Sequence, residues 1–205
     1  MTSTTGLRIS GALSLVLGVL AVVASFMTWV DLSDVGAEVF NPTGFGPRPL
    51  SRKRLTPGLP ALGWVTVPLG IAVIVAGVLA SMGRRFASVV VTGCGAALLV
   101  IAVSVCVWTT RVAMSLAQIG AESMSGSVGR PTMGVFVLLA AGLCAVLVGV
   151  VGAASSTTDC DAPRRAVGTS LAVAIGIGVA LGVIAVAGIW WLYSEPRHMP
   201  WWNGS

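Results

Sequence analysis

Residues able to do acid–base chemistry are few in this sequence, and they are scattered. The single histidine, His198, lies in the carboxy-terminal tail between Pro196 and Pro200. A general base must lie within hydrogen-bond reach of the group it deprotonates, and no nucleophile stands near His198 in the sequence. We therefore interpret His198 as a surface residue. We also find no phosphate-binding glycine loop and no pattern that would build a Ser-His-Asp arrangement.

The four cysteines form neither a ligand set nor a redox pair. Cys94, Cys106 and Cys144 lie in apolar segments, where cysteine behaves as a small hydrophobic residue. Cys160 stands between two aspartates in a polar loop that is too short for a calcium loop. With no Cys-x-x-Cys pair and no neighbouring histidine, the sequence predicts neither a bound metal nor a cofactor.

Five long segments contain no Asp, Glu, Lys, Arg or His, although proton relays, ion-coupled carriers and intramembrane hydrolases usually need such a residue. A helix rises about 1.5 Å per residue, so about 22 residues cross a hydrocarbon core of roughly 30 Å. The charged fraction is 9%, against about 25% in soluble domains. The sequence therefore predicts an all-α integral membrane bundle that is not an enzyme. Its five transmembrane helices are expected at residues 9–30, 61–82, 87–108, 132–154 and 167–193.

These segments predict one transmembrane domain with two longer polar connections, at residues 31–60 and 109–131. The first segment, 9–30, exceeds the 7–15 apolar residues typical of a signal peptide, so we expect it to be retained. The proline-rich connection 31–60 is either a solvated linker or a loop that docks a partner. The start of 109–131 either extends the preceding helix or lies on the membrane surface.

Tryptophans gather on one side of the predicted membrane. With alternating spans, the ends of the first, third and fifth segments and the start of the second all reach the same side. Indole rings favour the headgroup level, so this pattern predicts a one-sided aromatic belt. Its members are Trp29, Trp64, Trp108, Trp190 and Trp191, followed in the tail by Trp201 and Trp202.

Basic residues set the expected orientation. The Trp-rich side carries seven Lys and Arg residues and the other side five. However, the Arg84-Arg85 and Arg164-Arg165 pairs lie in the shortest loops, where the positive-inside rule acts most strongly. We therefore expect a bacterial inner-membrane protein with a cytoplasmic amino terminus. The net charge of +5 fits headgroup contact, and without interleaved aromatics it predicts no nucleic-acid binding.

Small residues recur at spacings that let membrane helices approach closely. Gly63, Gly70 and Gly77 repeat every seven residues, and Gly178 with Gly182 forms a Gly-x-x-x-Gly pair. Most of these faces can be used within one bundle, but five spans offer more of them than one bundle needs. We therefore expect contacts with other integral membrane subunits. The predicted contact residues are Gly178, Gly182, Arg52, Lys53 and Arg54.

Short motifs also resemble those of a family. Residues 28–30 close the first segment as Thr-Trp-Val, residues 55–62 open the second as Leu-Thr-Pro-Gly-Leu-Pro-Ala-Leu, and Arg84-Arg85 forms the turn. Across residues 7–108 the chain resembles small actinobacterial multi-pass membrane proteins of the tryptophan-operon-associated membrane protein type. It departs from them by a fifth span and a longer basic first loop. The resemblance implies membrane insertion and no defined activity or catalytic residues.

These observations favour a non-enzymatic accessory or scaffold subunit of a larger inner-membrane complex, best suited to transport. Small actinobacterial envelope proteins resemble, by analogy, accessory subunits of lipid importers and respiratory supercomplexes. The expected partners are the lipid bilayer and other membrane subunits. The alternative is a small carrier or channel for a hydrophobic molecule, which would use an uncharged cavity between spans.

Overall fold

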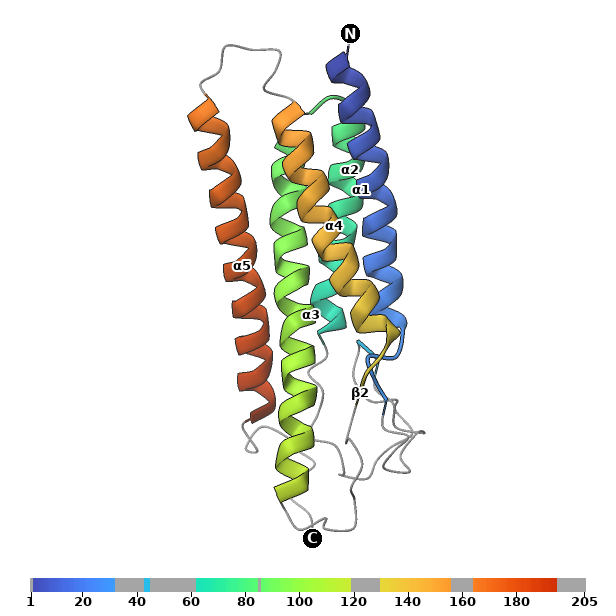
Figure 1. The fold of residues 1–205 in the computed structure, drawn as a ribbon, viewed down its shortest axis with the longest axis vertical. Helices are drawn as coiled ribbons and strands as arrows, with labels where there is room; N and C mark the ends of the chain where they lie inside the picture. Colours follow the sequence, from blue (N-terminus) through green and yellow to red (C-terminus); the bar gives the residue numbers. More distant parts are fainter. Residues whose placement is uncertain are drawn as a thin grey trace.

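The computed structural model of the chain describes residues 2–31, 43–44, 62–84, 86–118, 130–155 and 164–194. Five long helices account for most of this part of the chain (Figure 1). All five are long and apolar enough to cross a membrane, which confirms the predicted five-helix bundle. The elements in chain order are α1 (Thr2–Phe26), β1 (Val30–Asp31), α2 (Gly63–Ser81), α3 (Phe86–Gln118), β2 (Arg130–Pro131), α4 (Met133–Ser155) and α5 (Arg164–Ser194).

The helices form because the hydrocarbon core holds no water that could hydrogen-bond to the backbone. The N–H and C=O groups of each segment must therefore hydrogen-bond to one another. Polar side chains within the spans follow the same rule. The Ser14 hydroxyl lies 2.8 Å from the Ser10 carbonyl oxygen, and the Thr92 hydroxyl lies 2.9 Å from that of Ser88. Among the described residues, every buried side-chain nitrogen or oxygen has a hydrogen-bond partner. The interior of the bundle therefore contains some polar side chains, and those that the structure describes are all hydrogen-bonded.

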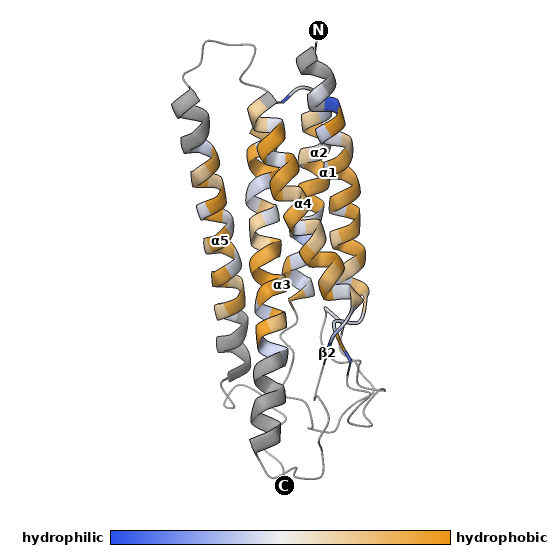
Figure 2. Ribbon diagram, viewed as in Figure 1, coloured by the Kyte–Doolittle hydropathy of each residue, from blue (hydrophilic) through white to orange (hydrophobic). Residues whose placement is uncertain are grey.

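The first four helices close into a ring, in which α1 packs on α2, α2 on α3, α3 on α4 and α4 on α1. Helix α5 lies outside this ring and packs mainly along α3 (Figure 1). The residues of the helices are largely hydrophobic over their middle lengths (Figure 2). We call the end that holds Arg8 and the α2–α3 turn the turn end, and the end that holds β1 and β2 the loop end.

Glycines bring α1 and α2 into backbone contact. A Cβ atom added at Gly11 would lie 2.7 Å from the Gly77 carbonyl oxygen. One added at Gly18 would lie 2.7 Å from the carbonyl oxygen of Gly70. Both distances are far too short for a real side chain. The seven-residue glycine spacing therefore serves packing within the chain, which is the main attraction available between helices in lipid.

The helix boundaries lie within three residues of the prediction for α2, α4 and α5, but α1 begins at Thr2 instead of residue 9, and α1 and α3 both end at other residues than predicted. The sequence predicts helix through residue 30, but α1 ends at Phe26. Residues 27–31 instead run as an extended segment that includes β1, because Thr28 to Asp31 pair with other backbone segments. Helix α3 continues to Gln118, so the start of the second polar connection extends the helix, which was one of the two predicted alternatives.

Candidate functional site

The loop end of the bundle is closed by a cap built around Trp29. Its side chain has no exposed surface, and its indole Nε1–H donates to the Ala24 carbonyl oxygen at 2.8 Å. Two glycines lie directly against the indole ring. A Cβ at Gly44 would lie 2.7 Å from the indole, and one at Gly134 would lie 3.0 Å from it. The ring is thus enclosed by segments that lie far apart in the sequence.

Backbone hydrogen bonds tie the same segments together. Val30 and Asp31 pair with Pro131 and Arg130 in a two-stranded antiparallel sheet. Thr28 pairs with Thr43 in an isolated bridge. These contacts fix where the connections after α1 and before α4 leave the bundle.

Three further hydrogen bonds connect the cap to the starts of two helices. The Thr132 N–H donates to the Trp29 carbonyl oxygen at 3.0 Å, and the Thr132 hydroxyl donates to the carbonyl oxygen of Thr28. The Gly63 N–H, at the start of α2, donates to the Gly44 carbonyl oxygen at 2.5 Å. The cap therefore joins the end of α1 to the beginnings of α2 and α4.

The predicted tryptophan belt needs a correction at Trp29. An interfacial tryptophan offers its ring to lipid headgroups, whereas Trp29 is wholly buried. Trp64, at the start of α2, is 72% exposed at the same end of the bundle. Trp108 is half-buried and packs against the core. Trp190 and Trp191 belong to α5, but their side chains lie outside the described part of the chain.

The predicted contact glycines of α5 are used inside the molecule. Gly178 is buried so closely against α3 that an added Cβ would collide with the Gly93 carbonyl oxygen. A Cβ at Gly182 would lie 2.9 Å from the Cβ of Val100. These two glycines attach α5 to α3, so they are not available to another subunit. The basic cluster Arg52, Lys53 and Arg54 lies outside the described residues.

The opposite side of α5 is open. Within the described chain, nothing lies within 4 Å of a Cβ added at Gly176. In this span 17% of the residues are buried, against 39–50% in the other four. We define the outer α5 face by its exposed residues Gly176, Ala180, Val183, Ile184 and Ala187. The sequence does not predict this face, because glycine and alanine occur on both sides of the helix.

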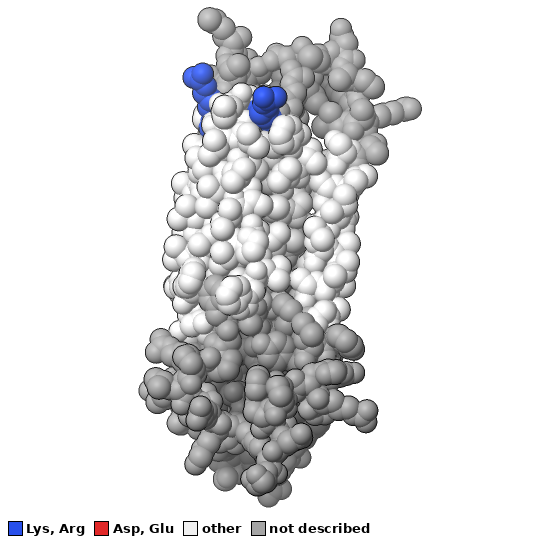
Figure 3. Space-filling view, turned by 180° about the vertical axis from the view of Figure 1, so that it is seen from behind, with Lys and Arg blue, Asp and Glu red and all other residues white. Residues whose placement is uncertain are grey.

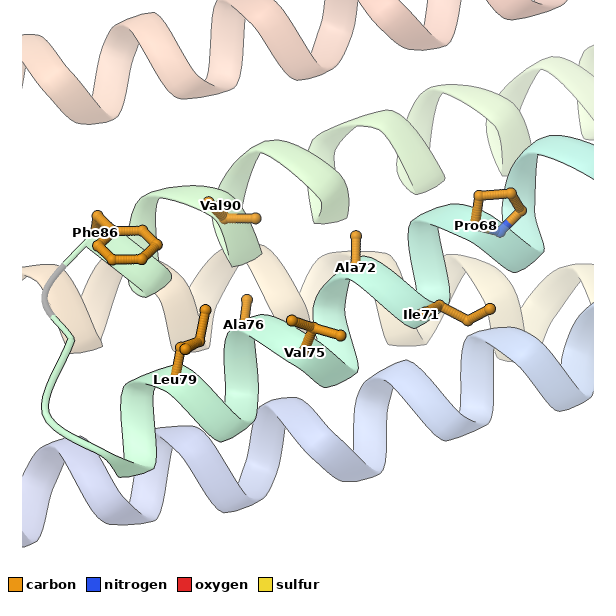
Figure 4. A pocket seen from close by; sticks show the side chains of 8 residues that line it. All are labelled: Pro68, Ile71, Ala72, Val75, Ala76, Leu79, Phe86 and Val90. Atoms are coloured by element: carbon orange, nitrogen blue, oxygen red, sulfur yellow. The ribbon is translucent and has the colours of Figure 1, made fainter.

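A shallow apolar groove runs between α2 and α3 on the surface of the ring. Its volume is about 440 Å³. The side chains along it come from both helices (Figure 4), and they are Pro68, Ile71, Ala72, Val75, Ala76, Leu79, Phe86 and Val90. No charged residue lines it. The groove exists because α2 and α3, although joined by a tight turn, pack less extensively than α1 with α2 or α3 with α4.

Residues that could support catalysis or metal binding do not assemble in the described part of the chain. No group of three His, Cys, Asp or Glu residues there could hold a metal ion. Cys94 and Cys106 lie in α3 and Cys144 in α4, each as a free thiol. His198 and Cys160 fall outside the described residues. Within the described residues, the features that stand out are the cap, the outer α5 face and the groove.

Comparison with known proteins adds no identification. No family model, curated protein or solved structure matches the chain. The resemblance to the tryptophan-operon-associated type stays a prediction from short motifs.

Proposed function

We propose that this multi-pass membrane protein is a non-enzymatic accessory subunit of a larger membrane complex, best suited to a transport complex. The observation that carries this proposal is the position of α5. Four helices complete a ring without it, and α5 leaves most of its span uncovered. A helix that a bundle does not need for closure, and whose free side carries small residues, suits packing against a helix of another subunit.

The absence of charge from the spans supports contact rather than chemistry. Figure 3 shows an uncharged middle band on the described surface seen from behind, with basic side chains at the turn end. Arg8 and Arg84 are exposed there. We further propose that the protein lies in a bacterial inner membrane with its turn end in the cytoplasm. Exposed arginines favour the cytoplasmic side of a membrane protein.

Copurification in mild detergent tests the accessory role. We expect the tagged chain to bring down one or more membrane proteins in stoichiometric amount. Gly176→Leu adds a side chain where the chain itself leaves open space, so the fold should survive while a partner helix is pushed away. Ala12→Leu on the exposed side of α1 is the matched control. A monodisperse chain that copurifies with no other protein would contradict the proposal.

The groove between α2 and α3 favours a second candidate, a carrier for a hydrophobic molecule. An apolar, uncharged surface channel suits such a cargo. Reconstitution of the pure chain in liposomes separates the two candidates. Flux of a hydrophobic substrate without any other protein would favour the carrier, and flux that requires a copurified partner would favour the accessory subunit.

A further inference from the structure

The α2–α3 turn carries an exposed arginine, Arg84, which lies in the chain between two residues that line the apolar groove, Leu79 and Phe86. Helix α2 ends at Ser81, and Gly83 reverses the chain with a positive φ of 82°, a conformation that glycine adopts readily. The Arg84 N–H then donates to the Leu79 carbonyl oxygen at 2.9 Å. Leu79 itself lines the groove. The backbone of Arg84 is therefore fixed directly to the groove wall at the turn end.

The groove has the length of one leaflet. Its lining on α2 runs from Pro68 to Leu79, which is about 16 Å along a helix axis. Half of the hydrocarbon core measures about 15 Å. In Figure 4, Phe86 and Leu79 lie at the turn end of the groove, and Pro68 lies at the other end. The groove thus begins within one helical turn of the end of α2 at Ser81 and reaches past the middle of α2 to Pro68.

We propose that this groove binds one anionic phospholipid, with an acyl chain along α2 and α3 and the phosphate at Arg84. A guanidinium group matches a phosphate by charge and by paired N–H donors. The floor of the groove at Ala72 and Ala76 is apolar, as a hydrocarbon chain requires. This inference rests on membrane insertion and does not depend on the accessory role.

A lipid chain fits the groove better than a partner helix does. An α-helix with its side chains measures about 10–12 Å across, whereas the groove is a shallow channel on the surface. Such a helix would stand largely outside the groove and contact its rim alone. A flexible acyl chain can follow the space between the Val75 and Val90 side chains instead.

Lipid retention by the full-length chain tests the proposal. The protein is purified in detergent, exposed to phosphatidylglycerol or phosphatidylcholine of the same chain length, and examined by native mass spectrometry. We expect one retained phosphatidylglycerol and a clear preference for it over phosphatidylcholine. Arg84→Gln should lower this preference about fivefold, the effect of one basic residue at a membrane surface. Arg8→Gln, the same change at the same end on α1, should leave the preference unchanged.

A second pair of variants tests the groove. Ala72→Phe fills the groove from its floor and should abolish retention of the lipid. Ala140→Phe, on an exposed position of α4, should retain it. Equal retention of both lipids by the unmodified protein, equal effects of the two arginine variants, or full retention by Ala72→Phe would each overturn the proposal. So would a photo-crosslinker at Val75 that forms a stoichiometric adduct with a protein instead of a phospholipid.

Discussion

At the scale of single residues, Trp29 has the sequence position of an interfacial tryptophan but is fully buried in the fold. It ends an apolar segment, which is the usual place of an interfacial tryptophan. Its burial depends on Gly44 and Gly134, both remote in sequence and both small enough to lie against the indole. Nothing local in the sequence marks these two glycines among the 26 in the chain. The cap could therefore not be predicted from the sequence.

Among the tryptophans whose side chains are described, substitution of Trp29 should lower the free energy of unfolding most. Trp29→Ala empties a fully enclosed space and should lower the free energy of unfolding by about 3–5 kcal/mol. Trp29→Phe removes the hydrogen bond to Ala24 while keeping an aromatic ring, and should cost about 1 kcal/mol for that bond. Thermal unfolding in detergent measures both changes.

Trp64→Ala and Trp64→Phe are the matched controls for this prediction. Trp64 is 72% exposed, so its substitution should change the free energy of unfolding by less than about 0.5 kcal/mol. Equal losses for Trp29→Ala and Trp64→Ala would show that Trp29 does not hold the loop end together.

At the scale of elements, the five helices could be predicted because uncharged apolar length is sufficient to define a span. Their arrangement could not be predicted, because small residues occur on nearly every helix. Gly178 and Gly182 were expected to face another subunit, yet they lie against α3. The end of α1 was also misplaced, since the long-range pairing of Thr28 and Val30 replaces the last helical turn.

Two glycines of α5 should respond in opposite ways to the same substitution. Gly178→Ala places a Cβ against the Gly93 carbonyl oxygen, so α5 must move away from α3 and the protein should become less stable. Gly176→Ala meets open space within the chain and should be neutral or slightly stabilising, because alanine favours a helix. Thermal unfolding of the two variants side by side measures the difference.

A disulfide between α3 and α5 is an independent test of the contact between these two helices. Cysteines placed at Val100 and Gly182 in a cysteine-free background should cross-link on oxidation, because a Cβ at Gly182 lies 2.9 Å from the Cβ of Val100 and a disulfide needs the two Cβ atoms about 4 Å apart. Adding Gly178→Ala should reduce that cross-link. Unchanged cross-linking and unchanged stability would mean that α3 and α5 are not in close backbone contact.

At the scale of the whole molecule, five membrane crossings place the turn end and the loop end on opposite sides. Met82 and Met133 mark these two ends, and they are 71% and 70% exposed. In a cysteine-free background, a membrane-impermeant maleimide applied to intact cells should label Met133→Cys and spare Met82→Cys. Permeabilised cells should label both. Labelling of both residues in intact cells would refute the five-span topology, and labelling of Met82→Cys alone would reverse the orientation.

The central claim is that the outer α5 face contacts another membrane protein. The most direct measurement is site-specific photo-crosslinking in intact membranes, before any detergent is added. A crosslinker at Ile184 on the outer α5 face, 65% exposed, is compared with one at Val16 on α1, 58% exposed. We predict a discrete protein adduct from Ile184 and lipid adducts alone from Val16. Lipid adducts alone from both positions would contradict the claim.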